Sequence, residues 1–265
     1  MNKKKLQSNA FSQALQKEWE NADGVNFALA LARLTGWAIS VDWYTEDQFA
    51  KEIDMIPLRV HVETDQNVIF DLTGKKSVAA YNQYTLMPLA QKRVHSGRGG
   101  IVNRHYSEEK VWTLPIRICP SELKIANALQ TISKNSAFLD QIPKRLNPEV
   151  PAYIACEFSF GRCAPYAEAL SEIKNLPAVA IIAEKYSEMF GNTKLGYCHS
   201  VVMHPDGEAE DAWGKQPLQT ILNRYGVIKF SFDQDLQNRI IQEAKNESME
   251  KYNQIYDRAK CYITL

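Results

Sequence analysis

The chain has 265 residues, of which 31 are Lys or Arg and 31 are Asp or Glu, and 45% of its residues are hydrophobic. This is the composition of an ordinary globular protein, so a disordered chain, a collagen-like repeat and a coiled coil are excluded. A formal net charge of zero gives no electrostatic reason to expect nucleic acid or an anionic membrane as a partner. We therefore expect the target to be a protein or a small molecule.

The cysteines and the apolar segments indicate the compartment. No apolar run approaches the roughly 20 residues of a membrane span, and no apolar signal core follows the start Met1-Asn-Lys-Lys-Lys. The five cysteines are odd in number and irregular in spacing, which is typical of reduced thiols and not of a disulfide scaffold. We therefore expect a cytoplasmic protein without a membrane segment.

In chain order, the first half of the sequence predicts helices followed by antiparallel strands. The expected elements are helices at 5–21 and 24–35, strands at 37–43, 57–64 and 68–72, and a helix from about residue 76. The segment 110–118 alternates like a strand, and 120–132 opens like a helix with Pro and Ser-Glu. The segment 133–151 contains three prolines and is the expected linker.

The second half predicts the same order of elements. They are a helix at 163–174, strands at 178–182, at 197–204 and around 210–212, a helix at 215–224, a strand at 227–232 and a long final helix. Pro205-Asp206-Gly207 is the expected turn between two of these strands. Asp233 is the expected N-cap of the final helix.

Two stretches about 139 residues apart line up without large gaps, which indicates a diverged duplication. The matched residues are Glu18-Trp19, Gly24 and Phe27-Ala28-Leu29-Ala30-Leu31 with Glu157-Phe158, Cys163 and Tyr166-Ala167-Glu168-Ala169-Leu170, then His61 and Asp71 with His199 and Asp211. The last two matches have offsets of 138 and 140. We place the boundary near residue 145, which gives units 1–145 and 146–265.

Three side chains of the second unit form a candidate catalytic set. Cys163 begins a helix, His199 lies inside a strand, and Asp211 follows a hairpin. A thiol in the first turn of a helix lies beside unpaired backbone N–H groups and the positive end of the dipole, which favour its thiolate and can hold an oxyanion. A histidine on a neighbouring strand can take the thiol proton, and a carboxylate can fix the ring tautomer.

Zinc binding is an alternative use of these residue types. The cysteines and histidines near the set are Cys156, Cys163, Cys198, His199 and His204. None of them has the short paired spacing of a structural zinc site, and Cys198 and His199 are expected on opposite faces of a strand. We therefore expect neither a metal nor a cofactor.

Three segments around the candidate set carry a resemblance to a known family: Gly161-Arg-Cys163-Ala-Pro-Tyr-Ala-Glu-Ala-Leu170, Tyr197-Cys-His199-Ser-Val-Val and Asp211-Ala-Trp-Gly214. They resemble the papain-like-fold cysteine hydrolases, in particular the minimal bacterial glutamine deamidases found among toxins and effectors. The resemblance implies that Cys163 is the nucleophile, His199 the base and Asp211 its orienter. A residue six positions before the cysteine, usually Gln, would help to form the oxyanion hole, and here that position is Glu157. A carboxylate there would repel an oxyanion unless it were protonated.

These features predict an α/β protein of the α+β type, made of two tandem papain-like units that each pack helices on a small antiparallel sheet. The first unit is expected to be degenerate, because Gly24 stands in the place of the nucleophile while His61 and Asp71 persist. The resemblance implies a thiol-dependent amide hydrolase that acts on a protein substrate. It favours glutamine deamidation by an effector that is delivered to the cytosol of a target cell.

Other functions stay open on the sequence alone. A cysteine protease and a transglutaminase-like acyltransferase use the same machinery. A different class is a non-catalytic binding or inhibitor module, because Gly24 indicates that one copy has already lost its nucleophile. The sequence does not specify the oligomeric state.

Overall fold

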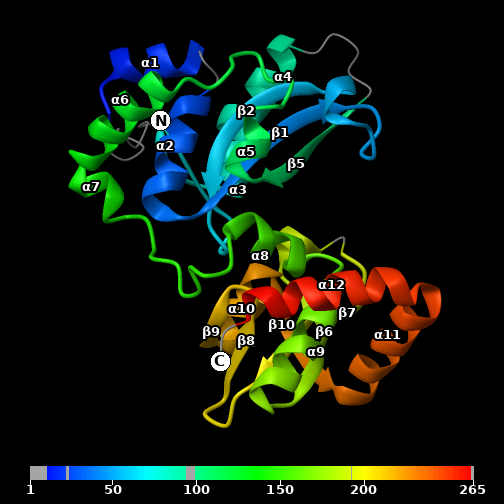
Figure 1. The fold of residues 1–265 in the computed structure, drawn as a ribbon. Helices are drawn as coiled ribbons and strands as arrows, with labels where there is room; N and C mark the ends of the chain where they lie inside the picture. The colour runs from blue at the N-terminus through cyan, green and yellow to red at the C-terminus, as the bar shows by residue number, and fades with distance from the viewer. Residues whose placement is uncertain (1–10, 22–23, 94–98, 192, 264–265) are drawn as a thin grey trace. The chain divides into compact units, whose positions relative to one another are not determined.

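The computed structural model describes residues 11–21, 24–93, 99–191 and 193–263 (Figure 1). The chain divides into two units, Met1–Arg145 and Leu146–Leu265, and the division coincides with the boundary placed near residue 145 from the sequence. Each unit packs helices on one five-stranded antiparallel sheet, which confirms the predicted α+β class. In the described ranges, no helix has the length and apolar character that a membrane crossing requires.

The first unit contains the elements from α1 to α7. They are α1 (Gln13–Asn21), α2 (Val25–Thr35), β1 (Ala38–Thr45), η1 (Glu52–Asp54), β2 (Ile56–Glu63), β3 (Val68–Asp71), β4 (Gly74–Ser77), α3 (Val78–Tyr81), the π-helical turn η2 (Asn82–Leu86), α4 (Met87–Arg93), β5 (Gly100–Tyr106), α5 (Glu108–Val111), α6 (Glu122–Ser133) and α7 (Ser136–Leu139). The strand order in its sheet is β4-β3-β2-β1-β5. Of the helix expected over 5–21, α1 is present, and residues 5–10 lie outside the described part of the chain.

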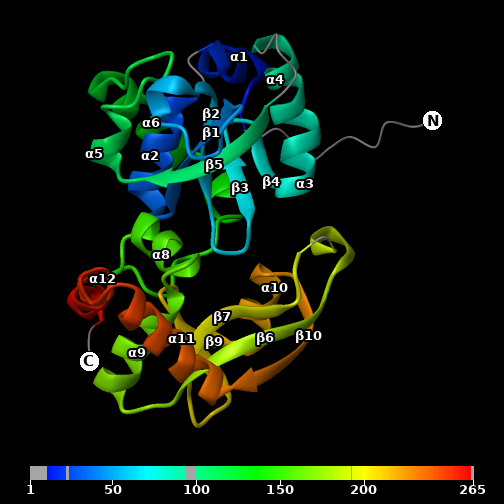
Figure 2. The same cartoon turned by 90° about the vertical axis from the view of Figure 1, so that its right-hand side faces the viewer.

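The second unit contains the elements from α8 to α12. They are α8 (Ala152–Ser159), α9 (Cys163–Lys174), β6 (Ala178–Tyr186), η3 (Glu188–Phe190), β7 (Gly196–Met203), β8 (Glu208–Asp211), β9 (Gly214–Pro217), α10 (Leu218–Arg224), β10 (Val227–Asp233), α11 (Gln234–Glu247) and α12 (Met249–Tyr262). The strand order in its sheet is β10-β6-β7-β8-β9. Figure 2 shows α9 and α11 on one side of this sheet and α10 on the other.

The two sheets have the same topology. The order β4-β3-β2-β1-β5 becomes β9-β8-β7-β6-β10 when the second sheet is followed from its other edge. In each unit a helix precedes the first strand of the sheet, and α2 and α9 both end at a left-handed residue, Gly36 and Asn175. These residues are 139 positions apart, which is the offset found in the sequence. The elements of the two sheets therefore correspond strand for strand.

The strand register corrects one residue match. A β-bulge interrupts the same pair of strands in both sheets: Asp42–Arg59 is followed by Trp43–Pro57, and Ile181–His199 is followed by Ile182–Tyr197. Arg59 therefore occupies the position of His199, and the expected match of His61 with His199 is wrong. Aligning the two histidines gives an offset of 138, whereas the register gives 140, the offset that relates Asp71 to Asp211.

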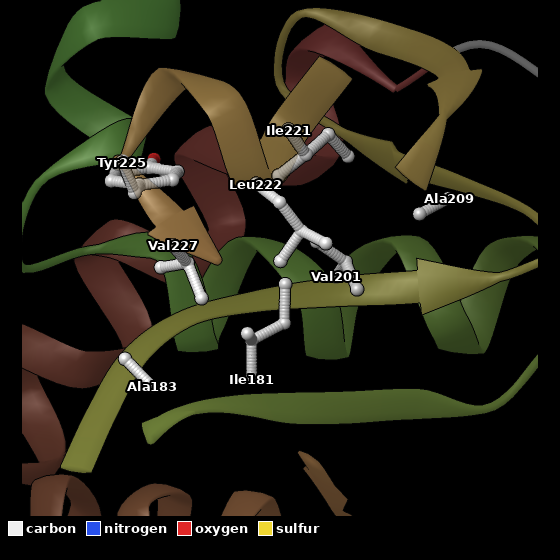
Figure 3. Close-up of a cluster of buried hydrophobic side chains, with 8 residues drawn as sticks. All are labelled: Ile181, Ala183, Val201, Ala209, Ile221, Leu222, Tyr225 and Val227. Atoms are coloured by element: carbon white, nitrogen blue, oxygen red, sulfur yellow. The ribbon is translucent and has the colours of Figure 1, made fainter. Parts of the chain in front are cut away.

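A buried hydrophobic cluster holds α10 on the second sheet (Figure 3). Its members come from β6, β7, β8, β10 and the α10 region: Ile181, Ala183, Val201, Ala209, Ile221, Leu222, Tyr225 and Val227. Fully burying a Val, Leu or Ile side chain contributes about 1.5–3 kcal/mol to the stability of the fold. Because Tyr225 directly follows α10, the cluster also fixes its ring beside His199, with the two ring centroids 4.6 Å apart.

The chain after β5 differs from the sequence prediction. A strand is expected over 110–118, but α5 ends at Val111, and the edge strand of the first sheet is β5. The Ser107 side chain accepts a hydrogen bond from the backbone N–H of Lys110 and so caps a helical turn. The cap outweighs the alternation of apolar and polar residues.

The final helix of the sequence prediction is two helices. Asp233 caps α11 as expected, because its side chain accepts a hydrogen bond from the backbone N–H of Leu236. Ser248 then ends α11 and caps α12 by accepting from the backbone N–H of Lys251. A side chain that caps one helix stops the preceding helix at the same residue.

Candidate active site

The connection from α8 to α9 places Cys163 at the start of a helix. Gly161 turns the chain with φ of +78°, a conformation that favours glycine, and Cys163 is the first residue of α9. Pro165 has no N–H, so Cys163 and Ala164 supply the backbone donors that the first turn leaves without helical partners. These donors and the helix dipole favour negative charge beside the thiol, whose residue is 6% exposed.

His199 is held by a buried carboxylate. It lies on β7 with 1% of its surface exposed, and its Nε2 is 3.0 Å from Oδ2 of Asp211. Asp211 also accepts hydrogen bonds from Nη1 of Arg224 at 2.6 Å and from the backbone N–H of Trp213 at 2.9 Å. Burial opposes ionisation of Asp211, but Arg224 and His199 outweigh it and lower the pKa of the carboxyl below its usual range. Asp211 is therefore a carboxylate that accepts a hydrogen bond from the ring.

Tyr225 contacts the other nitrogen of the ring. Its hydroxyl donates to the backbone carbonyl of Ser159 at 3.0 Å and lies 3.1 Å from Nδ1 of His199. Because the single hydroxyl proton is used at Ser159, the hydroxyl can only accept a hydrogen bond from Nδ1. Since Nε2 donates to Asp211, this arrangement favours a proton on each ring nitrogen, which is the charged form of His199.

The Cys163 thiol and the His199 ring shift each other's pKa in opposite directions. Burial opposes ionisation of the thiol, but the charge of His199 and a hydrogen bond from its ring lower the pKa of Cys163 below the ordinary value. Hydrogen bonds from the Tyr197 hydroxyl and the Ser200 backbone N–H act in the same direction. Burial also opposes the charged ring, yet Cys163 and Asp211 raise the pKa of His199 to about 9. The two groups therefore stabilise each other's charged forms, the thiolate of Cys163 and the imidazolium of His199.

Glu157 has a different environment from the one expected. It lies on α8, forms an ion pair with Arg162 next to α9, and is 2.9 Å from Nη1 of Arg258 on α12. The carboxylate is thus committed to two guanidinium groups. These contacts join α8 to the start of α9 and to α12, and they do not supply a donor for an oxyanion.

The matching position of the first unit holds a permanent cation in place of a titratable ring. Arg59 and Asp71 are both buried, with Nη2 and Oδ2 3.2 Å apart. Gly24 precedes α2 with φ of +71° and offers no nucleophile. His61 lies elsewhere on the sheet, where its Nδ1 is 3.1 Å from Oδ2 of Asp42. The first unit therefore keeps the carboxylate of the pair but neither the thiol nor the proton acceptor.

Sequence reasoning missed Tyr197 and Tyr225, which both contact the candidate catalytic set. The Tyr197 hydroxyl is 3.1 Å from Sγ of Cys163. Its position two residues before His199 on the same strand is the signal that could have found it. Tyr225 is 26 residues from His199 and reaches the ring only because α10 folds over the sheet. No local pattern indicates that contact.

Cys163, His199 and Asp211 thus lie in one buried cluster that can perform nucleophilic attack and proton transfer. Within the described ranges, no three His, Cys, Asp or Glu side chains are grouped as a metal site requires. Comparisons with family models, with curated proteins and with solved structures found no match for this chain.

Proposed function

We propose that the second unit is a thiol-dependent amide hydrolase with Cys163 as its nucleophile. The observation that carries the proposal is the lowered pKa of a thiol at a helix start, beside a histidine that Asp211 holds through Nε2. Structural cysteines that are simply buried have raised pKa values, because nothing stabilises their thiolates. Cys198 is such a thiol, since burial raises its pKa to about 11.

The reaction would have two steps. The Cys163 thiolate attacks the amide carbonyl, the C–N bond breaks, and the His199 imidazolium gives its proton to the leaving nitrogen. Water then attacks the thioester, His199 takes a proton from that water, and the carboxylic acid leaves as the thiol is restored. Asp211 keeps the ring oriented throughout and stabilises its charged form.

The preferred substrate is a glutamine side chain of a protein, so that the leaving group is ammonia. This choice rests on the resemblance of the segments around Cys163, His199 and Asp211 to bacterial glutamine deamidases. Attack on a peptide bond would make the protein a protease, and resolution of the thioester by an amine would make it an acyltransferase. The proposed place of action is the cytosol of the producing cell or of a target cell.

The first test compares the thiols of this chain with one another. We expect iodoacetamide at neutral pH to alkylate Cys163 before Cys198, with peptide mass spectrometry identifying the labelled residue. Cys198→Ala is the matched control and should leave the fast phase unchanged, whereas Cys163→Ala should remove it. Alkylation of Cys163 at the rate of an ordinary thiol would contradict the proposal.

The second test identifies the reaction. Candidate proteins are incubated with the wild type or with Cys163→Ala, and their intact masses are compared. Deamidation adds about one mass unit, proteolysis gives two fragments, and acyl transfer adds the mass of an amine. Identical profiles with the wild type and Cys163→Ala, together with tight binding to one of the proteins, would favour the non-catalytic binding module instead.

The binding module is the second candidate, and the first unit favours it. Arg59 replaces the titratable ring and Gly24 replaces the thiol, so this unit has kept the sheet without the reactive groups. A retained sheet without chemistry is suited to contact with a partner. Cys163→Ala would leave such binding intact, which separates the two candidates.

A further inference from the structure

The Tyr197 hydroxyl lies beside the candidate nucleophile at the edge of the buried cluster. Its oxygen is 3.1 Å from Sγ of Cys163, and 38% of the residue is exposed. Both Tyr197 and His199 are on β7, where the bulge at Cys198 lets them oppose consecutive residues of β6. The sulfur therefore has the imidazole and a partly exposed phenol as neighbours from one strand.

A chain of hydrogen bonds leads from the sulfur through Tyr197 into α11. The Tyr197 hydroxyl is 2.7 Å from Oγ of Ser200, which donates to Oε1 of Gln237 at 2.5 Å. The amide nitrogen of Gln237 donates to the backbone carbonyl of Ala164, so its oxygen is the atom that faces Ser200. Because an amide oxygen only accepts, the proton of Ser200 points to Gln237, and the Ser200 oxygen is then able to accept from Tyr197.

The hydrogen bonds from Cys163 to Gln237 can be arranged with their protons pointing in either of two directions. With a neutral thiol, Cys163 donates to Tyr197, Tyr197 to Ser200, and Ser200 to Gln237, so every proton has an acceptor. When negative charge appears beside Tyr197, its hydroxyl turns toward that charge, and Ser200 can donate to Tyr197 in return. Only hydroxyl hydrogens have to move, so Tyr197 is a donor that is ready before the charge develops.

The phenol keeps its proton throughout this exchange. Burial and the neighbouring Cys163 thiolate raise the pKa of Tyr197 above its usual value. A tyrosine with a raised pKa is protonated across the neutral range and acts by hydrogen bonding and not by giving up its proton. The Glu157 carboxylate, in the position where the related hydrolases usually carry a donor, is bound to Arg162 and Arg258.

We propose that Tyr197 is a catalytic residue whose hydroxyl, with the backbone N–H of Cys163, forms the oxyanion hole of the second unit. The proposal rests on the amide hydrolase function proposed above. The oxyanion and Sγ are bonded to the same carbon in the tetrahedral intermediate, so a donor that touches Sγ in the free protein is within reach of the oxyanion.

The step balances without any further reactant. The Cys163 thiolate forms the S–C bond while the electron pair of the carbonyl moves to its oxygen, and the Tyr197 hydroxyl turns from sulfur to that oxygen. When the intermediate collapses, the carbonyl re-forms, the C–N bond breaks, and the leaving nitrogen takes a proton from His199. The hydroxyl of Tyr197 then faces an uncharged thioester and can again donate to Ser200.

Two thiol reagents distinguish an oxyanion donor from a residue that only stabilises the thiolate. Iodoacetamide alkylates Cys163 without forming an oxyanion, whereas p-nitrophenyl acetate acylates it through a tetrahedral intermediate. Both rates are measured against pH on the full chain, and their plateau values are compared, because thiolate formation is complete there. Mass spectrometry confirms that Cys163 is the labelled residue in each case.

For Tyr197→Phe we expect the acylation plateau to fall about 100-fold, the lower end of what loss of one oxyanion-hole donor costs. The alkylation plateau should stay at the wild-type value, with its midpoint moved to higher pH. Tyr186→Phe is the matched control, because it removes a strand tyrosine hydroxyl that contacts Cys198 instead of Cys163. The ring of Tyr197 is partly exposed, so the variant should fold, and circular dichroism checks this.

The contrary outcomes are distinct. Equal changes in both plateau rates would mean that Tyr197 acts on the thiolate alone, and a faster Tyr197→Phe variant would mean that the hydroxyl restrains the nucleophile. Either result overturns the proposed oxyanion-hole role of Tyr197 and leaves the proposed hydrolase function in place. A wild-type Cys163 that reacts no faster than Cys198 with both reagents overturns the proposed function and this inference together.

Discussion

The two sheets carry the same carboxylate opposite two different cations. Asp211 holds His199 in the second unit, and Asp71 holds Arg59 at the matching position of the first. Each acid is the last residue of the third strand of its unit, counted along the chain. Each cation lies beside the β-bulge of its own sheet, at the matching position. A buried carboxylate with a cationic partner is therefore a shared feature of the two sheets, whether or not the unit carries a thiol.

What differs is whether the cation can exchange a proton. The imidazole of His199 can lose and regain a proton, whereas a guanidinium stays charged under all ordinary conditions. The two units also differ at the start of the helix before the sheet. In the second unit α9 begins with Cys163, and in the first unit α2 follows Gly24. The comparison teaches that one exchange of cation and one missing side chain distinguish the pair in the first unit from the proposed active site in the second.

The largest effect is expected from giving the second unit the cation of the first. In His199→Arg, the guanidinium can pair with Asp211 as Arg59 does with Asp71, but it cannot accept or return a proton. We expect turnover of p-nitrophenyl acetate to fall by a factor of about 10²–10⁴, the usual contribution of general acid–base catalysis. Arg59→His is the control and should leave turnover unchanged. Full turnover in His199→Arg would show that the cation is not the chemical difference between the units.

Removing either carboxylate should cost similar stability. Asp71→Ala leaves Arg59 buried without its partner, and Asp211→Ala does the same to Arg224, so each variant should lose about 3–5 kcal/mol in its free energy of unfolding. Urea denaturation followed by circular dichroism measures this loss, with the surface variant Asp206→Ala as the control. Only Asp211→Ala should also slow the alkylation of Cys163. A stability loss confined to one unit would break the structural half of the comparison.

The start of α2 should resist any added side chain. In Gly24→Ala the new Cβ would lie 3.2 Å from Cδ2 of Leu72, in a residue with φ of +71°, so we expect a loss of about 1–2 kcal/mol. Gly161→Ala has φ of +78° and open space around the new Cβ, so it reports the backbone strain alone. Thermal unfolding measures both variants. Equal losses would mean that crowding at Gly24 contributes nothing, and no loss at all would contradict the strain.

The smallest expected effect is a change in how the free energy of unfolding varies with pH. Burial opposes a charged ring at His61, but Asp42 and Glu63 raise its pKa from 6.5 to about 9. The folded protein thus binds more protons than the unfolded chain between these pH values, and the stability that this provides is complete below pH 6.5 and lost as pH rises through 9. His199 differs, because its raised pKa is accompanied by a lowered pKa at Cys163, and the two shifts change proton uptake on folding in opposite directions.

We therefore expect His61→Gln to flatten the fall of the unfolding free energy between pH 6.5 and 9 by up to about 1.4 kcal/mol per pH unit. His199→Gln should leave that slope in place. Urea denaturation at several pH values measures the slope in each variant. A larger flattening in His199→Gln than in His61→Gln would mean that the thiol does not compensate the ring.

The parts of the fold that follow from local patterns were predictable from the sequence. The helix from Cys163 to Lys174 was placed at its observed bounds, because its apolar residues recur at helical spacing. The Asp233 cap followed from the preference for aspartate at that position. In contrast, the sequence predicts the beginnings of helices where β4 and β9 lie, because short polar strands such as Gly74–Ser77 have no apolar alternation.

The parts of the candidate site that depend on strand register were not predictable. Matching His61 to His199 followed residue identity, whereas the bulge makes Arg59 the counterpart, and no sequence pattern announces a bulge. The contact of Tyr225 with His199 depends on how α10 packs on the sheet. Local sequence specifies which elements form, and the long-range register specifies which side chains meet.

The packing of α12 along α9 has a consequence for the order of synthesis. Tyr252 of α12 packs in a buried cluster with Ala164, the residue after Cys163. The Tyr252 hydroxyl donates a hydrogen bond to the Glu168 carboxylate on α9. Because α12 starts at Met249, a ribosome makes the thiol, the ring and the carboxylate well before it makes the helix that supports the thiol. A nascent chain that ends before Met249 contains all three proposed catalytic residues without that support. The proposed nucleophile would therefore gain this support only after α12 has left the ribosome.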